Sequence, residues 1–250
     1  MRFETIQIGE RGKVAEIILN RPTLGNKINI KMIDELEQAL RTIEDESPAA
    51  ALVIRGAGQA FCQGIDLSDF TPGAKPDAYG FAKWERVLLA LERLPKITLT
   101  AVDGECRGGG MHLLLACDIR IATKRSFFQL HEAPDGFLPG MAVFRLAKFI
   151  GLGRARRLAL TGRGLPAAEA ERIGLIDHLC AEGALDQAVI AALDEFKDIS
   201  PIASELTKRL LNESFSMSYE DYIGGFLAAQ QRVVLTDAFQ QRLRQKRGDQ

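Results

Sequence analysis

Short apolar runs that alternate with segments of helical periodicity are the feature of this sequence that most constrains its fold. Residues 51–54 are apolar at every position, as expected of a strand that is buried on both faces of a parallel sheet. Residues 97–102 and 119–122 form similar runs, and residues 30–43 and 81–94 show the spacing of amphipathic helices. This alternation predicts an α/β domain with a largely parallel sheet.

The second half of the chain carries a different pattern. Beyond about residue 145 the signal is almost wholly helical, which predicts helices appended to the sheet. Between the two helical segments of the first half, Pro72 and Pro76 predict a loop over residues 70–79. A length of 250 residues suits one large domain better than two ordinary ones.

Charge and cysteine content exclude several classes of function. Lys and Arg total 32 against 33 Asp and Glu, so a nucleic-acid partner is not expected. The four cysteines show no CxxC pair and no ligand spacing with histidine, which argues against a disulfide framework or a metal site. The first residues lack the apolar core of a signal peptide, and no apolar run approaches about 18 residues. We therefore expect a cytoplasmic protein with no membrane partner.

Two glycine-rich segments, residues 61–67 and 104–110, are candidate binding turns. Neither fits a dinucleotide or triphosphate motif, and no G-x-S-x-G elbow is present. Gly108, Gly109 and Gly110 precede a helical run, and the first turn of a helix has backbone N–H groups without intrahelical partners. Two such groups that converge on one oxygen form an oxyanion hole. The alternative is that the glycines only allow tight turns and close packing.

Together with their flanks, these segments form an ordered set of motifs that resembles the enoyl-CoA hydratase/isomerase (crotonase) superfamily. The resemblance covers most of the chain. The motifs, in order, are Asn20-Arg21-Pro22, Asn26-Lys27-Ile28-Asn29, Phe61 to Leu67, Val102-Asp103-Gly104, Gly108-Gly109-Gly110, Cys117 to Ala122, Leu138-Pro139-Gly140, Leu158 to Gly162 and Gly174-Leu175-Ile176.

The resemblance implies a crotonase-like spiral of ββα units with a C-terminal helical trimerisation region. It divides the chain into a core of residues 1–195 and a helical region of residues 196–250, assembled as a homotrimer or hexamer. It implies an acyl-CoA or acyl-phosphopantetheine substrate, the latter on an acyl carrier protein, and no tightly bound cofactor. The backbone amides of Ile65 and Gly109 would hold the thioester oxygen. The residues expected to line the substrate site are Gly64, Asp66, Arg107, Gly108, Gly110 and Gly140, with Asp66 steadying its loop.

Two positions carry the expected chemistry. Hydratases of this family orient one water with two glutamates, and by resemblance the second of these is Glu132, seven residues before Pro139. The first position, two residues after the triple glycine, holds His112 instead. One carboxylate above an enolate suffices to move a proton between carbons, which is isomerisation. Hydration needs a second group that helps Glu132 to orient the water. Either His112 is that group, or its ring only fills space. Near a helix N-terminus the neutral ring is favoured.

Arg107 is a further departure, because the superfamily usually has an apolar residue before the triple glycine. A guanidinium there would recognise a substrate carboxylate, or it points to solvent or another subunit. Three functions follow. The first is an enoyl-thioester isomerase or (de)hydratase that works through Glu132. The second is a dehydratase or decarboxylase of a carboxylated carrier-protein thioester in polyketide-type biosynthesis. The third is a non-catalytic thioester-binding protein.

Overall fold

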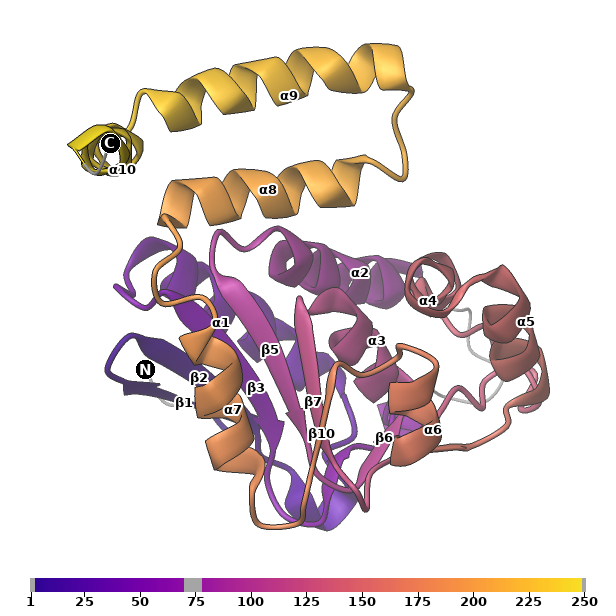
Figure 1. The fold of residues 1–250 in the computed structure, drawn as a ribbon. Coiled ribbons are helices and arrows are strands. Elements are labelled where there is room, and N and C mark those ends of the chain that lie inside the picture. The colour runs from indigo at the N-terminus through magenta and orange to yellow at the C-terminus, as the bar shows by residue number, and fades with distance from the viewer. Residues whose placement is uncertain (1–2, 70–77, 249–250) are drawn as a thin grey trace. The chain divides into compact units, whose positions relative to one another are not determined.

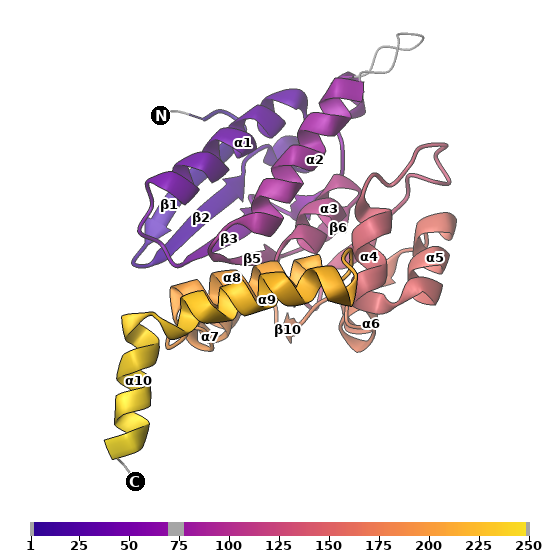
Figure 2. The same cartoon turned by 90° about the horizontal axis from the view of Figure 1, so that it is seen from above.

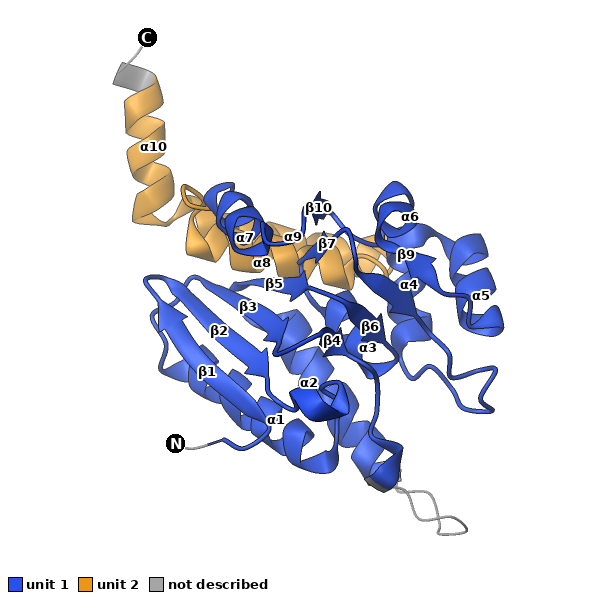
Figure 3. Ribbon diagram, turned by 90° about the horizontal axis from the view of Figure 1, so that it is seen from below, with its two compact units in different colours: residues 1–195 blue, residues 196–250 orange. Residues whose placement is uncertain are grey.

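The computed structural model describes residues 3–69 and 78–248, and the chain divides into two compact units, residues 1–195 and 196–250 (Figure 3). Most of the loop predicted for residues 70–79 lies outside the described residues. Unit 1 contains two sheets with helices packed around them (Figure 1). The larger sheet has the order β1-β2-β3-β5-β7-β10 and the smaller has the order β4-β6-β8-β9. All strand pairs are parallel except β1 with β2 and β8 with β9.

From β3 to β8, consecutive strands alternate between the two sheets. The strands are β1 (Ile6–Arg11), β2 (Val14–Leu19), β3 (Ala51–Gly56), β4 (Ala60–Cys62), β5 (Ile97–Val102), β6 (Glu105–Arg107), β7 (Ile119–Thr123), β8 (Phe127–Gln129), β9 (Leu165–Pro166) and β10 (His178–Cys180). In three consecutive units, β3-β4-α2, β5-β6-α3 and β7-β8-α4, the first strand joins the larger sheet, the second joins the smaller, and a helix follows. The predicted α/β spiral of ββα units is thereby confirmed.

The helices of unit 1 cover both faces of the larger sheet. They are α1 (Ile30–Asp45), α2 (Ala78–Arg93), α3 (Gly109–Ala116), α4 (Ala142–Ile150), α5 (Leu152–Thr161), α6 (Ala167–Arg172) and α7 (Leu185–Asp194), with short 3-10 turns η1 (Pro22–Leu24) and η2 (Leu67–Asp69). Figure 2 shows α1 and α2 side by side, and α7 packs on the opposite face (Figures 1 and 3). Asn29 begins α1, because its side chain accepts a hydrogen bond from the Met32 amide at 2.9 Å.

The core explains why the apolar runs become strands. Leu52 and Ile54 lie on one face of β3 and Val53 on the other, and all three are buried because helices cover both faces. Helix α3 is buried along its whole length, which places its N-terminus inside unit 1 rather than at the surface. A polar group near that N-terminus therefore lies in a low-dielectric environment.

Unit 2 contains three helices, α8 (Pro201–Glu213), α9 (Tyr219–Val234) and α10 (Asp237–Gly248). Helices α8 and α9 contact each other, and the Tyr222 hydroxyl donates a hydrogen bond to the Leu210 carbonyl at 3.1 Å. Ser218 begins α9 by accepting a hydrogen bond from the Asp221 amide. In neither described range is a helix both long and apolar enough to cross a bilayer.

Candidate active site

Two glycine-containing turns meet at one edge of the smaller sheet. Strand β4 leads into Gly64 and Ile65, and the adjacent strand β6 leads into Gly108 and α3. Because β4 and β6 are parallel, their carboxyl ends lie at the same edge. Gly64 (φ +108°) and Gly108 (φ +46°) adopt backbone conformations that favour glycine. A β-carbon at position 108 would lie only 3.3 Å from the Gly64 Cα, so the two turns are in contact.

The backbone amides of Ile65 and Gly109 are free to bind a ligand oxygen. Ile28 bridges the first turn: its N–H donates to the Gly64 carbonyl, and its carbonyl accepts from the Asp66 N–H, both at 2.8 Å. This pairing leaves the intervening amide of Ile65 out of the ladder. Gly109 is the first residue of α3, where amides have no intrahelical partner. Within residues 3–69 and 78–248, neither amide has a hydrogen-bond acceptor.

The remaining glycines and Asp66 shape these turns. A β-carbon at Gly110 would lie 2.6 Å from the Cys62 carbonyl oxygen, so this glycine lets α3 approach β4. Asp66 forms a 2.8 Å ion pair with Arg21 and accepts hydrogen bonds from the Ser68 side chain and amide. The Ser68 hydrogen bond and Arg21 hold the Asp66 pKa below its usual range against the effect of partial burial. Its carboxylate is therefore occupied in holding the first turn.

Glu132 lies beside both turns with its carboxylate buried. A β-carbon at Gly108 would be 3.0 Å from Glu132 Oε1, so the absence of a side chain at position 108 gives the carboxylate room. Burial raises the Glu132 pKa, although neighbouring backbone amides and His131 oppose the shift. The Oε2 atom is buried and has no hydrogen-bond partner among the described residues. A buried carboxylate with a raised pKa and an oxygen without a partner among the described residues is typical of a catalytic acid or base.

His112 faces Glu132 from the first turn of α3. Its Nε2 lies 3.8 Å from Glu132 Oε1, and its Nδ1 accepts a 3.1 Å hydrogen bond from the indole N–H of Trp84 on α2. Burial, together with the positive charge of Arg145, lowers the His112 pKa to about 4, against a smaller opposing effect of the Pro139 carbonyl. The ring is therefore neutral at pH 7. A β-carbon at Gly140 would lie 2.8 Å from His112 Cε1, so this glycine also borders the site.

Arg145 ties α4 to α2 behind His112. Its guanidinium is buried and forms ion pairs with Glu85 at 3.0 Å and Glu92 at 3.2 Å, both on α2. Glu85 also accepts a hydrogen bond from the Met141 amide at 3.2 Å. These contacts fix the rotation of α2, which carries Trp84, relative to the loop that carries Gly140.

In the structure the Arg107 guanidinium contacts side chains of the protein instead of facing the two glycine turns. Its guanidinium donates to Gln129 at 2.6 Å and to Glu105 at 2.8 Å, and it lies over the Phe127 ring. On β6 the side chains alternate, so the Arg107 side chain leaves the sheet on the face opposite to buried Cys106. Only the Arg107 carbonyl approaches the turns, 3.7 Å from where a Gly64 β-carbon would be.

Two residues near the site were not predicted. Alternation along an extended segment places His131 opposite Glu132, but β8 ends at Gln129 and a turn begins at Glu132, so the alternation does not continue. His131 Cε1 lies 3.4 Å from where a Gly108 β-carbon would be, beside the same turns. Trp84, a buried residue of α2, contacts His112. No local sequence signal identifies that contact.

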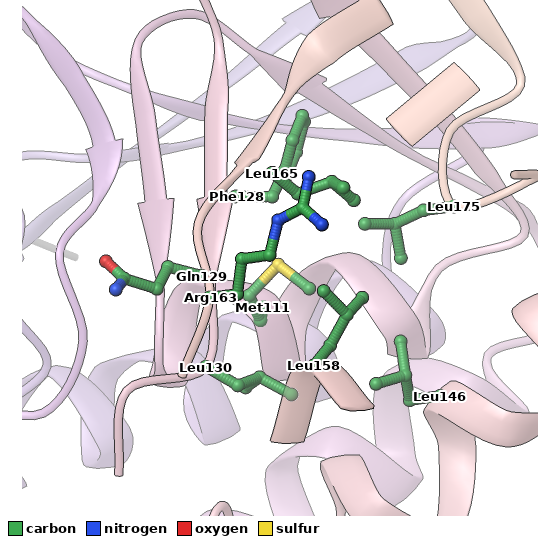
Figure 4. A pocket seen from close by; sticks show the side chains of 9 residues that line it. All are labelled: Met111, Phe128, Gln129, Leu130, Leu146, Leu158, Arg163, Leu165 and Leu175. Atoms are coloured by element: carbon green, nitrogen blue, oxygen red, sulfur yellow. The ribbon is translucent and has the colours of Figure 1, made fainter. Parts of the chain in front are cut away.

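A small apolar cavity lies on the other side of α3 (Figure 4). It is lined by Met111, Phe128, Gln129, Leu130, Leu146, Leu158, Arg163, Leu165 and Leu175. Its volume of about 10 Å³ is enough for about one water molecule, which is too small for an acyl chain. In the part of the chain that the structure describes, no group of His, Cys, Asp and Glu side chains is arranged to hold a metal ion.

Comparisons of the sequence and of the fold relate the chain to known proteins. Residues 9–247 match the family model described as enoyl-CoA hydratase/isomerase. A probable enoyl-CoA hydratase of Mycobacterium bovis is 34% identical over 225 residues, which cover 88% of this chain and 86% of that protein. The crystal structure of an enoyl-CoA hydratase from Bacillus anthracis superimposes with a TM-score of 0.90 at 27% identity, covering 99% of this chain and 97% of the other. A putative enoyl-CoA hydratase from Thermobifida fusca, solved in complex with acetoacetyl-CoA, gives a TM-score of 0.83 at 28% identity, covering 92% and 94%.

Proposed function

The chain belongs to the enoyl-CoA hydratase/isomerase family, and we propose that it is an enoyl-thioester isomerase or (de)hydratase in which Glu132 transfers the proton. The observation that carries this proposal is a buried carboxylate with a raised pKa beside two turns; among the described residues neither its Oε2 atom nor the amides of the two turns have a hydrogen-bond partner. Acetoacetyl-CoA bound to a structural relative supports an acyl-CoA substrate, with no tightly bound cofactor.

The two amides and the carboxylate have complementary roles. The N–H groups of Ile65 and Gly109 donate to the thioester oxygen, where negative charge develops when the α-proton leaves. Donors of this kind are worth about 2.7–4 kcal/mol each in the transition state. The raised pKa of Glu132 brings its proton affinity closer to that of the reacting carbon at neutral pH, which improves it as a general base. Gly64, Gly108 and Gly140 leave space for the acyl group between them.

The carrier-protein alternative assigns Arg107 or His112 to read a substrate carboxylate. The Arg107 guanidinium is instead hydrogen-bonded to Glu105 and Gln129, so within this alternative the reading of the carboxylate falls to His112. The non-catalytic alternative predicts that Glu132 is replaceable without effect on function. We further propose a cytoplasmic homotrimer or hexamer assembled through residues 196–250, which sedimentation of the full chain and of a chain truncated at residue 195 would test.

The decisive experiment compares Glu132→Gln with wild type on a panel of unsaturated and 3-hydroxyacyl thioesters in heavy water. Mass shifts report both proton exchange and water addition. The Gln side chain is nearly isosteric but cannot act as a base, so we expect a rate loss of about a hundredfold or more with the thioester still bound. Glu171→Gln, which removes an exposed carboxylate on α6, is the matched control and should keep full activity. Turnover by Glu132→Gln at the wild-type rate would refute the proposal.

A further inference from the structure

The hydrogen bond between Trp84 and His112 determines where the histidine proton lies. An indole N–H donates and cannot accept, so the ring nitrogen that faces it must be unprotonated. That nitrogen is Nδ1, 3.1 Å from the indole nitrogen. Because the ring is neutral, its single proton is on Nε2. Both side chains are buried, with Trp84 at 3% and His112 at 4% exposure, so water does not compete for this bond.

The protonated nitrogen points toward the carboxylate that the reaction uses. His112 Nε2 and Glu132 Oε1 are 3.8 Å apart, which is too long for a direct hydrogen bond. This separation suits two groups that each bind the same oxygen at about 2.8 Å. Both Nε2 and Glu132 Oε2 are buried without a hydrogen-bond partner among the described residues, and the Pro139 carbonyl is the other acceptor that faces the ring. Because one atom is a donor and the other an acceptor, one water molecule or substrate hydroxyl would join them.

We propose that Trp84 is a positioning residue that fixes His112 as an Nε2–H donor, and that His112 and Glu132 together hold the water that is added to, or removed from, the acyl chain. This inference rests on the proposed function and makes it more specific, because it assigns the site to hydration and dehydration. The His112 side chain thus takes the place of a second carboxylate by donating a hydrogen bond, without gaining or losing a proton.

The proton balance of hydration requires only one group that titrates. The water oxygen forms a bond to the β-carbon while it accepts a hydrogen bond from His112 Nε2–H, and one water proton passes to the Glu132 carboxylate. The electron pair of the carbon–carbon double bond moves onto the thioester oxygen, held by the amides of Ile65 and Gly109. Glu132 then returns the proton to the α-carbon. The sum is addition of one water, with Glu132 ionised and His112 neutral at both ends.

The first test reads the tautomer directly, without a substrate. Nitrogen-15 NMR of the full chain labelled at histidine distinguishes a protonated Nε2 from a protonated Nδ1, and His112→Gln identifies the signal among the three histidines. We expect a single Nε2–H form of His112 across pH 5 to 8. In Trp84→Phe, which keeps an aromatic ring but lacks the N–H, we expect a mixture of tautomers. Leu91→Ala, a buried truncation on the same helix, should leave the tautomer unchanged.

The second test follows hydration of crotonyl-CoA, or of the best thioester in the panel. Trp84→Phe should lower kcat about tenfold, as expected for loss of one hydrogen bond, with KM within about twofold. His112→Gln still carries an N–H donor and should keep a rate within about tenfold of wild type. His112→Phe has no donor and should lose about a hundredfold or more. All three should still exchange α-protons through Glu132.

Three results would overturn the roles given to Trp84 and His112. They are an Nδ1–H tautomer in the wild type, an unchanged tautomer and rate in Trp84→Phe, and a His112→Gln rate as low as that of His112→Phe, which would make His112 a base. Proton exchange without hydration of any thioester would also overturn the water-holding role. Activity retained by Glu132→Gln would instead refute the proposed function, and the NMR result for Trp84 would stand separately.

Discussion

Acidification should destabilise unit 1 in part through His112. The His112 pKa is about 4 in the folded chain, against an ordinary value of 6.5. Between these values the unfolded chain binds a proton that the folded chain does not, so stability is retained above pH 6.5 and is lost as the pH falls toward 4. The interval corresponds to about 3 kcal/mol.

The physical origin of this loss is the closed environment of the ring. Burial is the larger cause and the Arg145 charge the second. Other titratable groups near the ring are Glu132, Glu85 and His131. Glu132 acts in the opposite direction, because its pKa is raised and its contribution grows as the pH falls. The comparison is therefore made in a Glu132→Gln background, where this opposing effect is absent.

The assay is urea unfolding of Glu132→Gln and of the double variant Glu132→Gln/His112→Gln at pH 7, 6, 5 and 4. The stability of the histidine-containing chain should fall relative to the double variant by about 3 kcal/mol over this range. The matched control replaces the half-exposed His131 with Gln in the same background. The difference in free energy of unfolding between this chain and Glu132→Gln should change less over the same pH range. Parallel curves with and without His112 would refute a buried, neutral ring.

Three further predictions concern the same site. Glu132→Gln should raise the free energy of unfolding at pH 7 by about 0.5–2 kcal/mol in urea titrations, because it removes a buried charge whose pKa is raised. This gain should shrink toward pH 4.5, and a loss of stability at pH 7 would contradict the prediction. Arg145→Met should lower the free energy of unfolding by about 3–5 kcal/mol, because Glu85 and Glu92 would lose their buried partner. The same variant should raise the His112 pKa in an NMR titration, and an unshifted pKa would exclude Arg145 as a cause. Gly108→Ala should lower the melting temperature and abolish turnover, because a β-carbon there would press on Glu132 and Gly64, whereas Gly9→Ala, where a β-carbon meets open space, should change neither.

Local pattern was enough for the architecture and for part of the site. The apolar run of β3 and the period of α1 predicted a buried parallel sheet with helices, because these patterns follow from which faces are covered. The glycines at 64 and 108 marked the turns, since only a residue without a side chain tolerates both their φ values and the 3.3 Å approach. Glu132 was found by its place in a motif, and the structure puts its carboxylate beside those turns.

Contacts between distant segments required the tertiary structure. The Trp84–His112 hydrogen bond joins residues 28 positions apart, and it depends on how α2 is rotated against α3, which the Arg145 ion pairs help to set. Arg107 was placed near the substrate by sequence adjacency to the glycines, but strand alternation turns its side chain toward Glu105 and Gln129. His131 follows the end of β8, so strand alternation does not place it, and the structure brings its ring beside the Gly108 turn. Sequence period describes one element at a time, whereas the tautomer of His112 and the environment of Glu132 arise from several elements packed together.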